Sequence, residues 1–202
     1  MNEVVVIRTG TANLASVAAA LQRAGCSVKI SQNPNDVTAA GPLVLPGVGS
    51  FGAVIRRLDE LGLREPLRNR IESALPTLAI CLGLQLLATA SEENPGARGL
   101  GVLSTEATAF AEDLRVPHLG WNRVHAGDGC SLLEDGDAYF ANSYKLDRVP
   151  TGWSGATTDH GGEFVAAVER GPVLACQFHP ELSGPWGQAL IERWLVTAGE
   201  AT

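Results

Sequence analysis

Cysteine is scarce in this sequence, and the few that occur are not arranged in pairs. Cys26, Cys81, Cys130 and Cys176 are spread over 202 residues, with no Cys-x-x-Cys spacing. A disulfide framework or a zinc knuckle needs clustered cysteines, so the sequence favours neither. We therefore expect a protein of the reducing cytoplasm without a metal site. We also expect no cofactor.

Long apolar runs and blocks of one charge are also missing. The most apolar stretch, residues 75–90, is interrupted by Pro76, Thr77 and Gln85, and falls short of the roughly 18 apolar residues that cross a membrane. The start of the chain has no basic region typical of a signal peptide. The net charge of −7 argues against a surface that grips nucleic acid. We expect neither a membrane nor a nucleic acid as partner.

The apolar share of 45 % is enough for a sizeable core, and no repeat or linker divides the chain. We therefore expect one domain over residues 1–202. Short strand-like runs occur in the first half. These runs are residues 4–7, 27–30, 43–45 and 78–80. Apolar residues at helical spacing follow all but the second run, after which residues 33–36 predict a loop, and the last such stretch predicts a helix over residues 84–90. The alternation predicts an α/β fold with a mostly parallel sheet covered on both faces.

The second half of the chain changes character. Short strand-like segments separated by turns predict a mixed or antiparallel extension of the sheet. These segments are residues 100–104, 122–125, 138–141, 155–158, 164–168 and 173–178. An apolar helical face over residues 187–196 closes the chain.

Cys81 stands where an apolar strand gives way to a helix. Such a sharp turn pushes a nucleophile out of the sheet and tolerates only small neighbours, here Ala79 and Gly83. The N-terminus of the helix favours a thiolate beside it. The alternative is that Cys81 is a small buried hydrophobic residue, which we retain for the other three cysteines.

His179 and Glu181 offer a base and a group to orient it. His179 ends the apolar strand 173–178, and Glu181 lies two residues further on, where it can reach the imidazole ring. The ends of parallel strands share one crevice, which would bring His179 to Cys81. An ordinary surface His–Glu pair is the alternative, and a metal site with Cys81 matches no common spacing. His118, His125 and His160 are interpreted as structural or surface residues.

These segments together resemble the class I, triad-type glutamine amidotransferases. More narrowly, they are similar to the glutaminase subunits of imidazole glycerol phosphate synthases. The resemblance covers essentially the whole chain. It rests on residues 10–17 (GTANLASV), 45–52 (LPGVGSFG), 80–87 (ICLGLQLL), 117–122 (PHLGWN), 177–181 (QFHPE) and 183–184 (SG). It implies a three-layer, flavodoxin-like fold.

The resemblance also implies the chemistry. Cys81 would attack the side-chain amide of L-glutamine, while His179, oriented by Glu181, carries the proton. The oxyanion would be held by the N–H of Leu82 and by the Val48–Gly49 peptide. We call residues 46–49 the oxyanion loop. We hypothesise that the 48–49 peptide of this loop is oriented wrongly in the free protein and is reoriented by a partner. The implied glutamine-binding positions are Gly47, Gln85, Asn142, Ser143 and Tyr144.

The implied partner is a (β/α)8-barrel cyclase that forms a heterodimer with this chain. It would receive ammonia and produce imidazole glycerol phosphate and aminoimidazole carboxamide ribonucleotide, as part of histidine biosynthesis. Asn13, Pro117, His118 and Trp121 would lie at the interface. The chain departs from the usual family residues at Arg8, Ala79, Asn142 and Leu182.

Three other functions fit parts of the sequence. The GxGxxG run of residues 47–52 is typical of dinucleotide-binding enzymes, although it follows the third expected strand and not the first. A non-catalytic binding subunit could share the scaffold, but Cys81, His179 and Glu181 are all present. A glutaminase of another amidotransferase complex is the remaining alternative.

Overall fold

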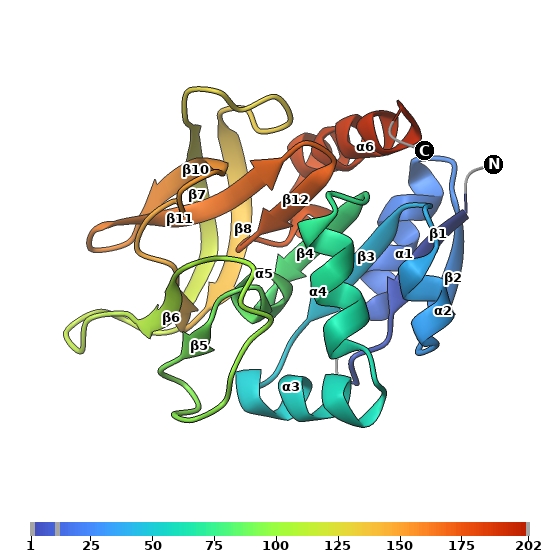
Figure 1. The fold of residues 1–202 in the computed structure, drawn as a ribbon. Helices are drawn as coiled ribbons and strands as arrows, with labels where there is room; N and C mark the ends of the chain where they lie inside the picture. Colours follow the sequence, from blue (N-terminus) through green and yellow to red (C-terminus); the bar gives the residue numbers. More distant parts are fainter. Residues whose placement is uncertain (1–2, 11–12, 201–202) are drawn as a thin grey trace.

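A large mixed sheet forms the centre of the molecule in the computed structural model, which describes residues 3–10 and 13–200 (Figure 1). Within those residues the sheet has nine strands, in the order β2-β1-β3-β4-β12-β11-β10-β7-β8. The first five strands are parallel. They are β2 (Ser27–Ser31), β1 (Glu3–Ile7), β3 (Leu43–Gly47), β4 (Thr77–Cys81) and β12 (Val173–Cys176). This order is that of a doubly wound, flavodoxin-like sheet.

The antiparallel extension continues from β12. Each of its strands pairs with its neighbour in the opposite direction. They are β11 (Glu163–Arg170), β10 (Ser154–Asp159), β7 (His118–Ala126) and β8 (Gly136–Asn142). A small second sheet contains β5 (Ala90–Ser91), β6 (Glu106–Ala109) and β9 (Tyr144–Lys145). The expected mixed extension is thus confirmed.

Helices cover both faces of the sheet and give the expected three layers (Figure 1). α1 (Leu14–Arg23) and α6 (Gly184–Glu200) pack on one face, with Leu21, Leu190 and Trp194 in the core. The other face is covered by α2 (Pro34–Thr38), α3 (Phe51–Glu60), α4 (Arg64–Glu72) and α5 (Leu82–Leu86). Among the described residues, no helix is long and apolar enough to span a membrane.

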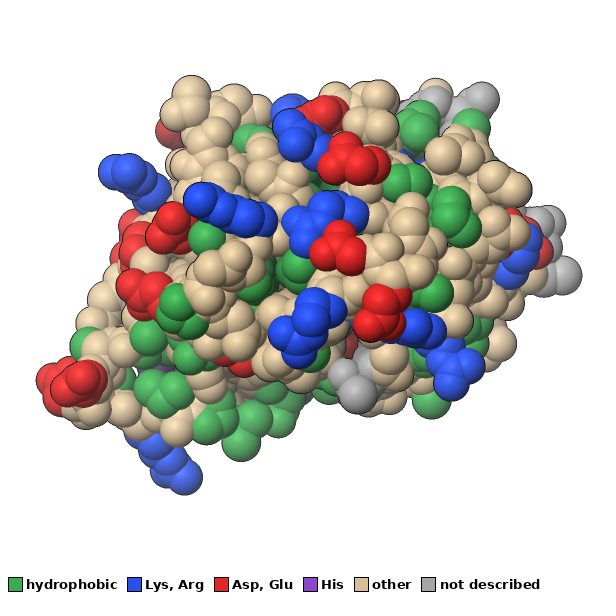
Figure 2. Space-filling model, turned by 60° about the horizontal axis from the view of Figure 1, so that its bottom comes forward, with side chains coloured by type: hydrophobic (Ala, Val, Ile, Leu, Met, Phe, Trp, Pro, Cys, Tyr) green, Lys and Arg blue, Asp and Glu red, His purple; other side chains and the backbone are tan. Residues whose placement is uncertain are grey.

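The surface at the bottom of Figure 1 carries charges of both signs. Figure 2 shows Lys and Arg side chains lying beside Asp and Glu there. The ion pairs of α3 and α4 include Arg57–Glu60 and Arg68–Glu72, at N–O distances of 3.0 and 2.9 Å. Exposed pairs of this kind add little stability.

The strand register places the carboxyl ends of two strands together. β4 and β12 are parallel neighbours, and Ile80 lies opposite Cys176. The chain therefore leaves both strands at the same edge of the sheet, just before Cys81 and His179. A crevice at this edge is where ligands bind in such folds.

Two expected elements differ in the structure. Residues 100–104 are not a strand, because the N–H groups of Leu100, Val102 and Leu103 bond to the carbonyls of Leu86 and Leu87 just after α5. Consequently the helix expected over residues 84–90 is short and ends at Leu86. The strand of this region is β6 instead, a few residues later.

Candidate active site

Cys81 occupies a strained turn between β4 and α5. Its φ of 55° and ψ of −110° lie in a region that residues with a side chain rarely adopt. Gly83 makes the turn possible, because a Cβ there would lie 2.2 Å from the carbonyl oxygen of Leu45. Gly47 lies opposite Cys81 in the sheet, and a Cβ on it would lie 3.0 Å from Leu82 Cβ. The predicted nucleophile turn is therefore built by close backbone contacts.

A cavity of about 390 Å³ opens around this turn. It is lined by Val48, Gly49, Cys81, Leu82, Gln85, Glu93, Ala141, Asn142, Ser143, Tyr144 and His179. These include every residue expected to hold the oxyanion or the substrate, except Gly47. Gly47 packs beneath the nucleophile turn instead and does not line the cavity.

His179 reaches the cavity from the segment after β12. Its Nδ1 lies 2.9 Å from Glu181 Oε1, and both side chains are buried. The backbone of His179 is fixed as well, since its N–H donates to Tyr139 and its carbonyl accepts from Ser183 Oγ. Burial disfavours the imidazolium, but hydrogen bonds to Cys81 and Glu181 and their charges outweigh it. They raise the pKa of His179 to about 10.

Gln177 is a site residue that the sequence analysis did not assign. Its Nε2 lies 3.8 Å from Cys81 Sγ, and its Oε1 accepts from Gln85 Nε2 at 3.0 Å. Gln85 Nε2 also donates to the carbonyl of Tyr144 at 2.9 Å. The sequence does indicate this position, because Gln177 and His179 are two residues apart along an extended segment and their side chains therefore point to the same side.

Glu93 was also missed, and it contacts the loop that carries Val48 and Gly49. Its Oε2 accepts from the N–H of Phe51 at 2.7 Å, at the start of α3. Asn94 Oδ1 accepts from the next N–H, that of Gly52, at the same distance. A carboxylate at this helix start would repel a pyrophosphate, so the geometry does not favour the dinucleotide-binding alternative.

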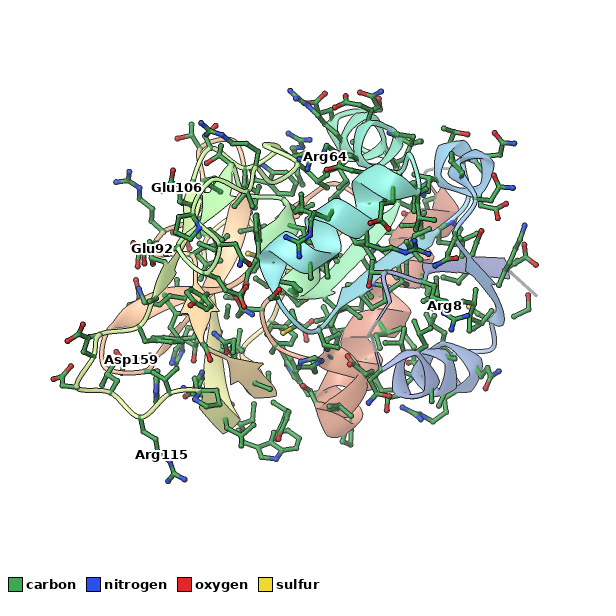
Figure 3. All side chains as sticks on the ribbon, turned by 90° about the horizontal axis from the view of Figure 1, so that it is seen from below. Arg8, Arg64, Glu92, Glu106, Arg115 and Asp159 are labelled. Carbon is green, nitrogen blue, oxygen red and sulfur yellow. The ribbon has the colours of Figure 1, made fainter. Side chains whose placement is uncertain are left out.

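The residues expected at a partner interface lie in two places. Pro117, His118 and Trp121 line a second cavity of about 560 Å³, and Arg115 at its rim points away from the protein (Figure 3). Asn13 lies elsewhere, where its side chain caps α1 by accepting from the N–H of Ser16 at 3.4 Å. Residues 11 and 12 of the same motif lie outside the described part of the chain.

His118 is buried and stacks on His160, with 4.3 Å between the ring centroids. Burial and the neighbouring His160 lower the pKa of His118 to about 4, against a smaller opposing effect of the Asn142 side chain. The ring is therefore neutral at pH 7. Across the strand pair, His118 lies opposite Asn142, which lines the cavity around Cys81.

Comparisons with known proteins identify the family of the chain. The profile of the family described as "Glutamine amidotransferase class-I" matches residues 5–198. The imidazole glycerol phosphate synthase subunit HisH of Deinococcus radiodurans is 40 % identical over 195 residues, covering 94 % of this chain and 91 % of that protein. The crystal structure of a glutamine amidotransferase has the same fold. Its TM-score is 0.78 and its identity 24 %, and the match covers 97 % of this chain and 98 % of that one.

A relative from Arabidopsis thaliana is longer. The chloroplastic imidazole glycerol phosphate synthase hisHF is 38 % identical over 201 residues, which cover 95 % of this chain and 34 % of that protein. The chain thus spans about a third of this relative but nearly all of the bacterial HisH subunit. By the family profile and these identities, the chain belongs to the class I glutamine amidotransferases and, among them, to the HisH subunits of imidazole glycerol phosphate synthase.

Proposed function

We propose that this chain is a glutaminase that hydrolyses L-glutamine to glutamate and ammonia and delivers the ammonia to a cyclase subunit in histidine biosynthesis. One observation carries the proposal. A cysteine on a strained strand-to-helix turn shares a cavity with a buried histidine whose ring is held by a carboxylate at 2.9 Å. A nucleophile, a base and an orienting group are the parts that acyl transfer needs.

The first half of the reaction forms a thioester. The Cys81 thiolate attacks the side-chain amide carbon of glutamine, and the carbonyl oxygen becomes an oxyanion. The Leu82 N–H and the Val48–Gly49 peptide are the proposed donors to that oxygen. The C–N bond then breaks as the His179 imidazolium gives its proton to the leaving nitrogen, so ammonia departs. The raised pKa of His179 supports this role, because the ring holds a proton at neutral pH.

The second half releases glutamate. Neutral His179 accepts a proton from water as the oxygen attacks the thioester carbon, and a second oxyanion forms in the same place. The C–S bond breaks, and Cys81 returns to the thiolate beside imidazolium. Glu181 remains a carboxylate throughout and keeps the ring in one orientation through Nδ1.

Gln85 and the segment Asn142–Tyr144 are proposed to hold the substrate. Among the described residues that line the cavity, Glu93 is the one acidic side chain, which suits the α-ammonium group of glutamine. Gly47 keeps a supporting role, because it allows the loop to pack against the nucleophile turn.

A glutamine-like diazo-ketone tests this proposal. The reagent alkylates an activated thiolate within a glutamine site, so mass spectrometry should find an adduct on Cys81. Cys130 is the internal control, since it is partly exposed but outside the cavity. Cys81→Ala should abolish glutamate release by the complex, whereas Cys130→Ala should leave it unchanged. Labelling of Cys130 alone, or an active Cys81→Ala variant, would contradict the proposal.

We further propose that the cyclase partner is a (β/α)8 barrel and that it forms a heterodimer with this chain. Its contact surface would include Asn13, Pro117, His118 and Trp121. Support comes from exposed apolar side chains around the second cavity, since Trp121 is 58 % and Leu119 65 % exposed. Exposed aromatic anchors of this kind often dominate binding. We also propose one domain over residues 1–202 and a cytoplasmic location.

Trp121→Ala tests the interface. An aromatic side chain that becomes buried at the centre of an interface contributes about 2 kcal/mol or more to binding. The affinity of the Trp121→Ala variant for the cyclase, measured by calorimetry, should therefore fall about 30-fold. Val196→Ala is the matched control, because Val196 is 63 % exposed on α6, outside the proposed surface. Equal effects of the two substitutions would place the interface elsewhere.

The oxyanion loop offers a separate test of activation by the partner. If the partner and its nucleotide ligand reorient the Val48–Gly49 peptide, glutamate release should be much faster in the complex than in the free chain. Similar rates in both would contradict this part of the proposal.

A further inference from the structure

The start of α3 is capped by residues that lie far away in the sequence. Ser50 stands at the N-cap, where a hydroxyl usually accepts from the helix, but its side chain makes no such bond. The first two N–H groups of the helix donate instead to Glu93 and Asn94, each at 2.7 Å. The end of the oxyanion loop is therefore fixed by the segment after β5.

Asn94 is itself firmly held. Its N–H donates to the carbonyl of Ser91 at 3.2 Å, and its carbonyl accepts from the N–H of Ala97 at 3.0 Å. Its side chain lies so close to Gly52 that a Cβ there would stand 2.9 Å from Asn94 Cγ. This contact explains the last glycine of the 47–52 motif, because only glycine leaves room for the Asn94 cap.

The other end of the loop is fixed as well. Buried Thr9 donates its hydroxyl to the carbonyl of Pro46 at 3.1 Å. Val48 and Gly49 lie between these two anchors and line the cavity with Cys81. Gly49 has a φ of 96°, a conformation that glycine adopts without strain. The position of the 48–49 peptide relative to the sulfur thus depends on where the two anchors hold the loop.

We propose that Asn94 is a positioning residue for the oxyanion loop of the glutaminase reaction. It acts through Gly52 and does not line the cavity, unlike Glu93, so its effect is separable from substrate binding. This inference rests on the proposed function. It predicts that loss of the Asn94 acceptor impairs the transition state and leaves ground-state binding of glutamine nearly intact.

Asn94→Ala in the complex with the cyclase subunit tests the proposal. The kcat for glutamine should fall about 10-fold or more, since small misplacement of an oxyanion donor has effects of this size, while KM changes less than about 3-fold. Asn94→Asp keeps an acceptor at the helix start and should restore kcat to within about 3-fold of wild type. Glutamate γ-semialdehyde, which forms a thiohemiacetal oxyanion on the cysteine, should bind Asn94→Ala about 10-fold more weakly, and glutamate equally well.

Asn33→Ala is the matched control. Asn33 caps α2 by accepting from the N–H of Asn35 at 3.0 Å, and α2 does not line the cavity. This variant should lose similar stability without loss of kcat. An Asn94→Ala variant with wild-type kcat, or an equal fall of kcat in Asn33→Ala, would overturn the proposal.

Hydrogen exchange separates this proposal from the proposed function. The amides of residues 48–52 should exchange faster in Asn94→Ala than in wild type, whether or not the complex is active. Unchanged exchange there would refute the positioning role by itself. A wild-type complex that releases no glutamate would instead contradict the proposed function.

Discussion

Among the described residues, only one oxygen of the Glu181 carboxylate has a hydrogen-bond partner. Oε1 lies 2.9 Å from His179 Nδ1, while buried Oε2 has no hydrogen-bond partner among the described residues. Its hydrogen bond and charge help to raise the pKa of His179 to about 10. A group with a raised pKa stabilises the folded state fully below its unfolded pKa, near 6.5, and loses that contribution as the pH rises toward 10.

Glu181→Gln removes the charge and keeps the shape. We expect kcat for glutamate release to fall about 10-fold to 100-fold, because the imidazolium is no longer stabilised. The alkaline limb of the pH–rate profile, where His179 loses its proton, should move to lower pH. Glu134→Gln is the control, since Glu134 is an exposed partner of Arg193. An unchanged profile would mean that Glu181 does not orient the base.

Because His118 is held neutral in the folded state, we expect the free energy of unfolding to fall in acid. The folded state keeps it neutral to about pH 4, whereas the unfolded chain takes up the proton near 6.5. Stability is thus lost as the pH falls from about 6.5 toward 4, by about 2 kcal/mol at pH 5. Urea unfolding at pH 7.5 and pH 5 should show that His118→Gln loses this part of the dependence. His125→Gln, at an exposed position, should retain it.

Among the elements, α4 is joined to its surroundings by one buried cation. Arg70 is 2 % exposed and donates to Thr77 Oγ1 and to the carbonyls of Val37, Ala39, Gly41 and Pro76. It has no carboxylate partner among the described residues, and burial lowers its pKa to about 10, so the guanidinium remains charged at neutral pH. The side chain links α2, the start of β3 and the start of β4.

Arg70→Met should therefore destabilise the fold severely. Several buried oxygens would lose their donors, which is expected to lower the free energy of unfolding by about 3 kcal/mol or more. Arg68→Met on the same helix breaks only an exposed ion pair with Glu72 and should change it by less than about 1 kcal/mol. Chemical denaturation of both variants gives the comparison, and equal stabilities would contradict this role of Arg70.

The elements that the sequence predicted correctly are those with a strong local pattern. The apolar runs that became β1, β3 and β4 needed no tertiary information. By contrast, residues 33–36 predict a loop, although Asn33 and Pro34 in fact begin α2. An Asn-Pro pair starts turns and helices alike, so local chemistry does not choose between them.

The same distinction applies to the site. Cys81, His179 and Glu181 stand in short motifs that suggest their chemistry when taken together and with the family resemblance, although each motif by itself also fits a structural cysteine or a surface His–Glu pair. Glu93 and Asn94 meet α3 across 42 positions of sequence. Only the folded chain brings such groups together, so no local signal could have found them.

At the scale of the whole molecule, the two cores share their strands. Leu78 and Ile80 of β4 belong to the core beneath α1 and α6, and Ala79 between them belongs to the opposite core. Alternate residues of one strand point to opposite faces. Unfolding of the helices on one face of the sheet would therefore expose one side of the same strands that carry the core on the other face.

This coupling predicts one cooperative unfolding transition, as expected for a single domain. Far-UV circular dichroism and tryptophan fluorescence should give the same urea midpoint. Trp194 is a suitable fluorescent probe, because it is fully buried on α6 and its Nε1 donates to the carbonyl of Pro172 at 2.9 Å. The Trp121→Ala variant removes an exposed fluorophore from the antiparallel half and sharpens the comparison. Two separated midpoints would mean that the parallel and antiparallel halves unfold independently, and that the chain holds two domains.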